Sequence, residues 1–236
     1  MSGTLYGIGT GPGDPELLTL KAVRLIAAAG AVAYPARPGA DSLARRIAAA
    51  HLREGVAEIR IEVPMKRDRA PAQAAYDAGA ERLAELLAAG RDVVFLCEGD
   101  PMFYGSFMYL QARLADRFAV RAVPGVSALH AAPARLGRAL AARDQVLTVL
   151  PGTLDDRALE PRIRGADSVA ILKVGRHLPR LRALIARMGL LERAHFIAEA
   201  TLAGERQAPL AEAPDRAPYF SMILIAKGDD PWLERR

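Results

Sequence analysis

Three turns in the sequence combine glycine with residues that could hold a ligand. Gly9-Thr-Gly-Pro-Gly-Asp-Pro15 follows an apolar run, and Glu98-Gly-Asp-Pro101 follows the apolar run Val93–Cys97. The third turn is Val123-Pro-Gly-Val-Ser-Ala128. At the carboxyl end of a parallel strand, a glycine turn leaves backbone N–H groups pointing outward, and ligands of open α/β sheets bind at that edge. One such turn is usually structural, whereas three in one chain favour a shared ligand site.

The first turn does not match the standard nucleotide-binding loops. A dinucleotide fingerprint that starts at Gly7 needs a third glycine where Pro12 stands, and no acidic residue follows at the distance a ribose requires. No Gly-Lys-Ser/Thr follows, which excludes a P-loop. The turn does predict a helix start, because Asp14 is a natural N-cap and Pro15 fits the first helical position. A nicotinamide-dependent oxidoreductase is therefore disfavoured.

Composition and charge indicate a cytoplasmic globular protein. The 236 residues are 51% hydrophobic, and no apolar run reaches the roughly 18 residues of a membrane span. The N-terminal stretch does not show the pattern of a signal peptide, so secretion is not expected. The single Cys97 fits a buried thiol in a reducing compartment. The net charge of +5 suits nucleic acid or a polyanionic small molecule, but the aromatic content is only 6%. Nucleic acid is thus the weaker interpretation, and no metal-ligand spacing is found.

Apolar runs alternate with amphipathic stretches, which predicts an α/β protein with mostly parallel sheets covered on both faces. The last run, residues 219–226, is a candidate for antiparallel pairing. A boundary is expected near Arg121-Ala-Val-Pro-Gly125, which divides the chain into α/β domains of residues 1–120 and 121–236. A cleft between two such halves is a favoured place for a ligand. The expected strands are residues 5–9, 59–63, 93–97, 120–123, 146–150, 169–174, 195–198 and 220–226.

These motifs, in this order, resemble those of the tetrapyrrole methylases, which move a methyl group from S-adenosylmethionine. The resemblance covers nearly the whole chain and includes Glu199-Ala-Thr201 and the final Tyr219-Phe-Ser-Met222 strand. Within the family, the N-terminal stretch and Pro64-Met-Lys-Arg-Asp68 are most similar to members that methylate precorrin-2 at C20, although Lys66 stands where the family pattern has Thr or Ser. The resemblance implies two αβα domains with S-adenosylmethionine in the cleft between them, and a homodimer.

The resemblance also assigns roles to single residues. Pro12, Gly13 and Asp14 would line the acceptor side of the site. The cofactor would contact Glu98, Gly99, Asp100, Met102, Phe103, Tyr104, Ser127, Ala128, Val174, Ala200, Leu202 and Met222. Because the acceptor is a polycarboxylate, Arg37, Lys66 and Arg67 are candidate clamps for its carboxylates. Asp100 is the first candidate for the proton acceptor, with the alternative that it only shapes its turn, while Tyr104, Glu98 and His130 are further candidates.

Several alternatives stay open at this point. Related enzymes methylate other tetrapyrrole positions, cobalt-loaded precorrin-2, ribosomal RNA or a diphthamide precursor. The Pro64-Met65 loop and the polyanion argument favour the members that methylate precorrin-2 at C20. Metal-free and cobalt-loaded acceptors differ little in charge, so the sequence does not separate them. A noncatalytic nucleotide- or RNA-binding module is the alternative of a different class, and the basic run that it would need is missing.

Overall fold

The computed structural model describes residues 1–65 and 68–228, and the chain forms two compact units. The first unit is Met1–Ser127, and the second begins at Ala128. The boundary expected after residue 120 falls inside strand β5 (Ala119–Val123), which pairs with strand β1 (Thr4–Gly9) of the first unit. Strand β5 thus belongs to the first unit, which extends to Ser127.

The first unit contains a five-stranded sheet in the order β3-β2-β4-β1-β5, with every pair parallel. Its other strands are β2 (Ala31–Ala36), β3 (Ala57–Glu62) and β4 (Val93–Cys97). All five residues of β4 are buried, as expected of a central parallel strand that is covered on both faces. The carboxyl ends of these strands therefore lie at one edge of the sheet.

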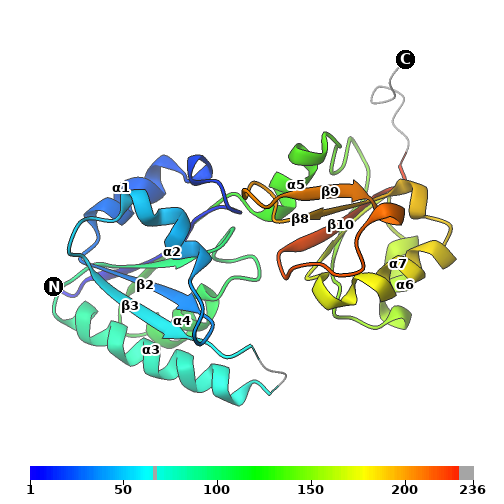
Figure 1. Cartoon of the computed structure of the whole chain (residues 1–236). Helices are drawn as coiled ribbons and strands as arrows, with labels where there is room; N and C mark the ends of the chain where they lie inside the picture. The colour runs from blue at the N-terminus through cyan, green and yellow to red at the C-terminus, as the bar shows by residue number, and fades with distance from the viewer. Residues whose placement is uncertain (66–67, 229–236) are drawn as a thin grey trace. The chain divides into compact units, whose positions relative to one another are not determined.

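Helices cover both faces of this sheet (Figure 1). Helices α3 (Ala70–Ala88) and α4 (Phe107–Leu114) lie on one side, and their apolar residues form a core with alternate residues of the strands, including Phe95 against Phe107. Helices α1 (Leu20–Ala28) and α2 (Leu43–Ala48) lie on the other side. A side-chain oxygen caps each of these two, because Thr19 accepts from the Ala22 N–H and Ser42 accepts from the Arg45 N–H.

The second unit contains a mixed sheet in the order β6-β7-β10-β8-β9. Strands β6 (Leu147–Pro151) and β7 (Ser168–Leu172) are parallel, whereas β10 (Ser221–Ala226) is antiparallel to β7 and to β8 (Ala194–Ala198). The short strand β9 (Arg206–Pro209) adds antiparallel to β8. The antiparallel pairing expected of the last strand is confirmed, and it places the start of β10 beside the carboxyl ends of β7 and β8.

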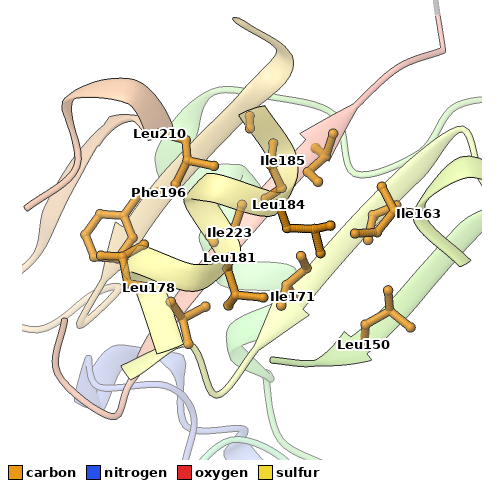
Figure 2. Close-up of a cluster of buried hydrophobic side chains, with 14 of the residues drawn as sticks. Leu150, Ile163, Ile171, Leu178, Leu181, Leu184, Ile185, Phe196, Leu210 and Ile223 are labelled. Atoms are coloured by element: carbon orange, nitrogen blue, oxygen red, sulfur yellow. The ribbon is translucent and has the colours of Figure 1, made fainter. Parts of the chain in front are cut away.

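The core of the second unit lies between this sheet and helices α6 (Asp156–Arg164) and α7 (Leu178–Arg187). Figure 2 shows leucine and isoleucine side chains of α7 packed among residues of β7, β8 and β10. Helix α5 (Ala128–Leu136) lies on the opposite side of the sheet (Figure 1). The remaining helical segments are short 3-10 turns at Pro15–Leu17, Ala49–His51, Gly175–His177, Leu191–Arg193 and Leu210–Glu212.

The α/β class is confirmed, but the sequence pattern does not predict two strands, β2 and β9. The sequence of β2 contains three alanines and Pro35, which are poor strand formers, and β9 contains Arg206 and Gln207 at an edge. Both form because a neighbouring strand offers a full register of partners. Within the described residues, no helix is long and apolar enough to cross a membrane.

Candidate functional site

The three glycine turns predicted to form a ligand site meet at one edge of the first sheet. They follow β4, β1 and β5, which are neighbours in the sheet, so the order of the strands brings the turns together. Gly11 and Gly99 form an isolated antiparallel bridge, in which the Gly99 N–H donates to the Gly11 carbonyl at 2.8 Å and the Gly11 N–H to the Gly99 carbonyl at 3.3 Å. Two of the turns are thus joined by their backbones.

The close approach of these turns requires glycine. A Cβ atom on Gly9 would lie 2.5 Å from the Gly99 carbonyl oxygen and 2.6 Å from the Gly125 Cα. A Cβ atom on Gly125 would lie 2.7 Å from the Gly9 Cα, so neither position has room for a side chain. Gly99 also has a φ of 65°, which disfavours any residue with a Cβ. The glycines therefore serve the packing of three backbones against one another.

Asp100 ties the second turn to the third. Its Oδ1 accepts the Met102 N–H at 2.8 Å, and its Oδ2 accepts the Gly125 N–H at 3.1 Å. Both carboxylate oxygens thus fix backbone, one within the turn after β4 and one in the segment after β5. The structure supports the shaping role that was the alternative to proton transfer, and the catalytic role of Asp100 stays a prediction.

The first turn places Pro12, Gly13 and Asp14 directly beyond β1. Asp14 accepts the Glu16 N–H at 2.9 Å and caps the 3-10 turn that begins at Pro15, so the predicted N-cap is confirmed. The α-helix itself begins later than the turn suggests, at Leu20. Gly13 is buried, whereas Pro12 and Asp14 retain exposed surface at the same edge as the Gly99 turn.

The turn after β4 presents large side chains to solvent. Met102 is 47% exposed and Tyr104 is 48% exposed, both high fractions for apolar or aromatic groups. Tyr104 has a φ of 57°, a left-handed conformation that is uncommon outside glycine, and its ring lies edge-on to that of Phe103 at 4.9 Å. Strained backbone of this kind concentrates at ligand sites.

Glu98 lies between buried strand β4 and the Gly99 turn. Its Oε1 accepts the Ala44 N–H at 3.4 Å, and burial of its carboxyl raises its pKa above the ordinary value. The neighbouring Cys97 is fully enclosed in the core, where desolvation raises the pKa of its thiol, so it is inert rather than nucleophilic. Thr10 is also buried and donates its hydroxyl to the Cys97 carbonyl at 2.9 Å.

One of the candidate carboxylate clamps, Arg37, lies at the end of a neighbouring strand. Arg37 follows β2 directly and is exposed, and its carbonyl accepts from the guanidinium of Arg60, which also holds the Ala40 carbonyl at 2.8 Å. Lys66 and Arg67 lie outside the described residues. The structure therefore places Arg37 at the same sheet edge as the three turns.

In the second unit, the predicted cofactor residues gather at one edge of the second sheet. Val174 follows β7, Ala200 and Leu202 follow β8, and Met222 is near the start of β10. Ala200 and Leu202 are half-buried, whereas the side chains of Val174 and Met222 are buried, and Val174 belongs to the core cluster. Ser127 ends the first unit as a buried residue, and Ala128, which is exposed, begins α5. The cofactor roles of all these residues stay predictions.

Several residues at the edge of the second sheet have left-handed backbone, which the sequence does not predict. Lys173, Glu199 and Thr201 have φ values of 58°, 52° and 69°, and they follow the carboxyl ends of β7 and β8. Their residue types give no signal for this conformation, because glycine or asparagine is the usual occupant. The Glu199-Ala-Thr201 motif is thus a strained turn rather than only a sequence signature.

Acidic, cysteine and histidine side chains do not gather into a metal site in the part of the chain that is described. His130, named as a further candidate base, is exposed on α5. His195 lies in β8, where burial and the nearby Arg138 lower its pKa below the ordinary value. The chemistry of the site therefore rests on its turns and carboxylates.

The protein is thus an α/β protein of two units, and glycine turns of the kind that bind ligands follow the carboxyl ends of strands in its first sheet. The chain belongs to the tetrapyrrole (corrin/porphyrin) methylases, since the model of that family matches residues 4–214. This result confirms the family resemblance of the sequence motifs.

Individual relatives extend over almost the full chain. A precorrin-2 C(20)-methyltransferase from Sinorhizobium is 40% identical over 232 residues, which cover 94% of this chain and 95% of that protein. A cobalt-precorrin-2 C(20)-methyltransferase from Salmonella typhimurium is 36% identical over 231 residues, covering 96% and 98%. A uroporphyrin-III C-methyltransferase from Thermus thermophilus, solved in complex with S-adenosylhomocysteine, has a TM-score of 0.68 at 25% identity and covers 95% of this chain and 98% of its own.

Proposed function

We propose that this protein transfers a methyl group from S-adenosylmethionine to C20 of precorrin-2, giving precorrin-3A in cobalamin biosynthesis. The observation that carries the proposal is the 40% identity to a precorrin-2 C(20)-methyltransferase over nearly the whole of both chains. The structural neighbour in complex with S-adenosylhomocysteine supports the choice of methyl donor.

The residues at the edge of the first sheet fit such a donor. Gly9, Gly99 and Gly125 let the three turns pack backbone against backbone, and a Cβ at Gly9 or Gly125 would clash with this packing. Beside these glycines stand the exposed Met102 and Tyr104, which offer apolar and aromatic surface. The donor supplies an electrophilic methyl on a sulfonium. An aromatic face attracts a cation, so Tyr104 suits a position beside that charge.

The substrate is a polycarboxylate, and the protein has a net charge of +5. We assign carboxylate binding to Arg37 at the end of β2 and, by their place in the sequence after β3, to Lys66 and Arg67. Guanidinium groups suit this role because they donate paired hydrogen bonds to a carboxylate. Pro12 and Asp14, at the end of β1, are the proposed neighbours of the acceptor.

Catalysis by such a site depends mainly on placement. The bridging carbon of the acceptor is already electron-rich, and the orientation of two bound reactants can contribute about 7–11 kcal/mol to lowering the barrier. Asp100 contributes by holding the Gly99 turn and the Gly125 segment in one arrangement. Of the candidate proton acceptors, Glu98 has the raised pKa that makes a carboxylate a stronger base.

The alternative acceptor is cobalt-loaded precorrin-2, favoured by the 36% identity to the Salmonella typhimurium enzyme. The higher identity to the Sinorhizobium protein leads us to propose the metal-free acceptor. A homodimer is a further prediction from the family resemblance, and light scattering of the purified protein tests it. A cytoplasmic location is a further prediction from the composition and the single cysteine.

The proposal is tested by incubating the protein with S-adenosylmethionine and precorrin-2 and measuring the mass of the product. We expect a gain of one methyl group with precorrin-2 and a slower reaction with cobalt-precorrin-2. A faster reaction with the cobalt-loaded acceptor would establish the alternative, and no mass gain with either acceptor would refute both.

A further inference from the structure

The turn that follows β8 carries two of the proposed cofactor residues and adopts an unfavourable conformation. Glu199 and Thr201, on either side of Ala200, both have left-handed backbone. Each non-glycine residue in this region costs on the order of 1 kcal/mol, so surrounding interactions must hold the turn in place.

Backbone contacts fix the two ends of the turn. The Glu199 N–H donates to the Phe220 carbonyl at 2.7 Å, which ties the end of β8 to the residue before β10. The Leu202 N–H donates to the Glu199 carbonyl at 2.9 Å, and the Glu205 N–H donates to the Leu202 carbonyl at 3.0 Å. Gly204 lies so near the Glu199 carboxylate that a Cβ there would approach it to 2.5 Å.

The centre of the turn is held by a side chain. Oε2 of Glu205 accepts the Thr201 N–H at 2.7 Å, and the Glu205 side chain is only 12% exposed. Nε of Arg135, on α5, lies 2.9 Å from each oxygen of the same carboxylate. Glu205 is thus nearly enclosed, charged and paired with a cation from another element, and a charge-assisted hydrogen bond of this kind is stronger than a neutral one.

We propose that Glu205 and Arg135 are positioning residues, which set the conformation of the Glu199–Leu202 turn and thereby the affinity for S-adenosylmethionine. The inference rests on the proposed function, through the assignment of Ala200 and Leu202 to cofactor binding. Glu205 acts through the Thr201 N–H, and Arg135 acts by holding and neutralising the Glu205 carboxylate.

Four variants separate this role from a general effect on folding. Glu205→Ala removes the acceptor for Thr201, Glu205→Gln keeps an oxygen for it but loses the charge, and Arg135→Met removes only the cation. The matched control is Asp156→Asn, which weakens a network of two arginines in the same unit, on α6 and α7, without touching the turn. Each variant is measured for thermal stability, for S-adenosylhomocysteine affinity by calorimetry and for KM and kcat.

We expect Glu205→Ala to weaken S-adenosylhomocysteine binding about tenfold, the size expected for a lost charge-assisted hydrogen bond. Glu205→Gln and Arg135→Met should show smaller losses, about threefold, and the KM for S-adenosylmethionine should rise while kcat changes less than about twofold. Hydrogen exchange at the Thr201 amide should accelerate in Glu205→Ala. Asp156→Asn should bind as the unchanged protein does.

Equal affinity of the unchanged protein and Glu205→Ala would overturn the inference while leaving the proposed function intact. An equal loss of affinity in Asp156→Asn would also overturn it, because the effect would then follow stability alone. Failure of the unchanged protein to bind S-adenosylhomocysteine would refute the proposed function and, with it, this inference. If Glu205→Ala does not fold, Glu205→Gln and Arg135→Met decide the matter by the same comparison.

Discussion

Gly11 and Gly99, which are 88 residues apart in the sequence, exchange a pair of backbone hydrogen bonds of 3.3 and 2.8 Å. The bridge joins the turn after β1 to the turn after β4 at the edge of a parallel sheet. Gly125 packs against Gly9 and against the Gly99 carbonyl, so the backbones of all three turns are in contact. The arrangement of the site depends on this close packing.

Gly125→Ala should disturb the packed turns, because the new Cβ would lie 2.7 Å from the Gly9 Cα. We expect a loss of about 1–3 kcal/mol in the free energy of unfolding, as for an overpacked core, and weaker S-adenosylhomocysteine binding. Chemical denaturation and calorimetry measure the two effects. Gly165→Ala is the control, since its Cβ would meet no atom closer than 3.4 Å, and an equal effect of both variants would contradict the packing argument.

Asp100→Asn should act mainly on binding. An asparagine keeps one oxygen, so one of the N–H groups of Met102 and Gly125 loses its acceptor, at a cost of about 1–3 kcal/mol. We expect lower thermal stability and a higher dissociation constant for S-adenosylhomocysteine, measured by calorimetry. A variant with unchanged affinity and a greatly reduced kcat would show instead that Asp100 transfers the proton.

Glu98→Gln should stabilise the protein near neutral pH. Burial raises the pKa of Glu98 in the folded state above its unfolded value, so the folded state favours the protonated carboxyl. The protonated Glu98 carboxyl contributes its whole share of the folding stability below the unfolded pKa of about 4. This share is lost as the pH rises through the folded pKa. Because glutamine does not ionise, the variant should unfold at higher temperature than the unchanged protein at pH 7 and show a smaller advantage at pH 4. A variant that is less stable than the unchanged protein at pH 7 would contradict a raised pKa for the buried Glu98 carboxyl.

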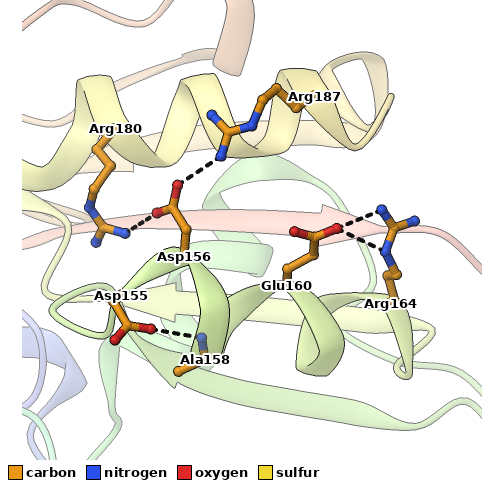
Figure 3. Close-up of polar contacts among 7 residues, drawn as sticks. All are labelled: Asp155, Asp156, Ala158, Glu160, Arg164, Arg180 and Arg187. Atoms are coloured by element: carbon orange, nitrogen blue, oxygen red, sulfur yellow. Dashed lines mark hydrogen bonds and ion pairs between the residues drawn. The ribbon is translucent and has the colours of Figure 1, made fainter.

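Asp156→Asn should remove an acid-sensitive part of the stability of the second unit. Arg187, at 2.8 Å, and Arg180 hold the carboxylate of Asp156 (Figure 3), and their hydrogen bonds lower its pKa. A lowered folded pKa gives stability that is present above the unfolded pKa of about 4 and is lost as pH falls through the folded pKa.

The loss in Asp156→Asn at pH 7 should be about 1 kcal/mol or less, since the groups are partly exposed, and it should shrink as the pH falls toward the folded pKa. Urea unfolding at pH 7 and at pH 3 measures it. Glu160→Gln, which weakens the more exposed pair with Arg164 on the same helix, should have a smaller effect. A loss that persists unchanged at pH 3 would exclude the ion pairs as its cause.

Much of the fold follows from local sequence because strong apolar runs such as Val93–Cys97 are bounded by glycine and proline. The sequence also predicts the Asp14 cap, whose hydrogen bond is local. Strand β2 is not predicted, because its alanines and Pro35 carry no strand preference and its pairing with β3 and β4 comes from residues distant in sequence. Tertiary pairing decides such segments.

The candidate site, like the fold, could be predicted from the sequence only in part. The three glycine turns are visible in the sequence, but the mutual contact of Gly9, Gly99 and Gly125 depends on the strand order β4-β1-β5, which local patterns do not contain. The left-handed conformations of Thr201 and Tyr104 are likewise hidden, since neither residue type favours them. The contact of Glu205 with Arg135 spans 70 residues and has no sequence signature.

The most direct test of the account is the position of the transferred methyl group. Precorrin-2 is incubated with the protein and with S-adenosylmethionine that carries ¹³C in its methyl, and the product is examined by NMR. The account predicts a single labelled methyl on C20. A label on any other carbon of the macrocycle, or an unlabelled macrocycle after incubation with protein that binds S-adenosylhomocysteine, would contradict it.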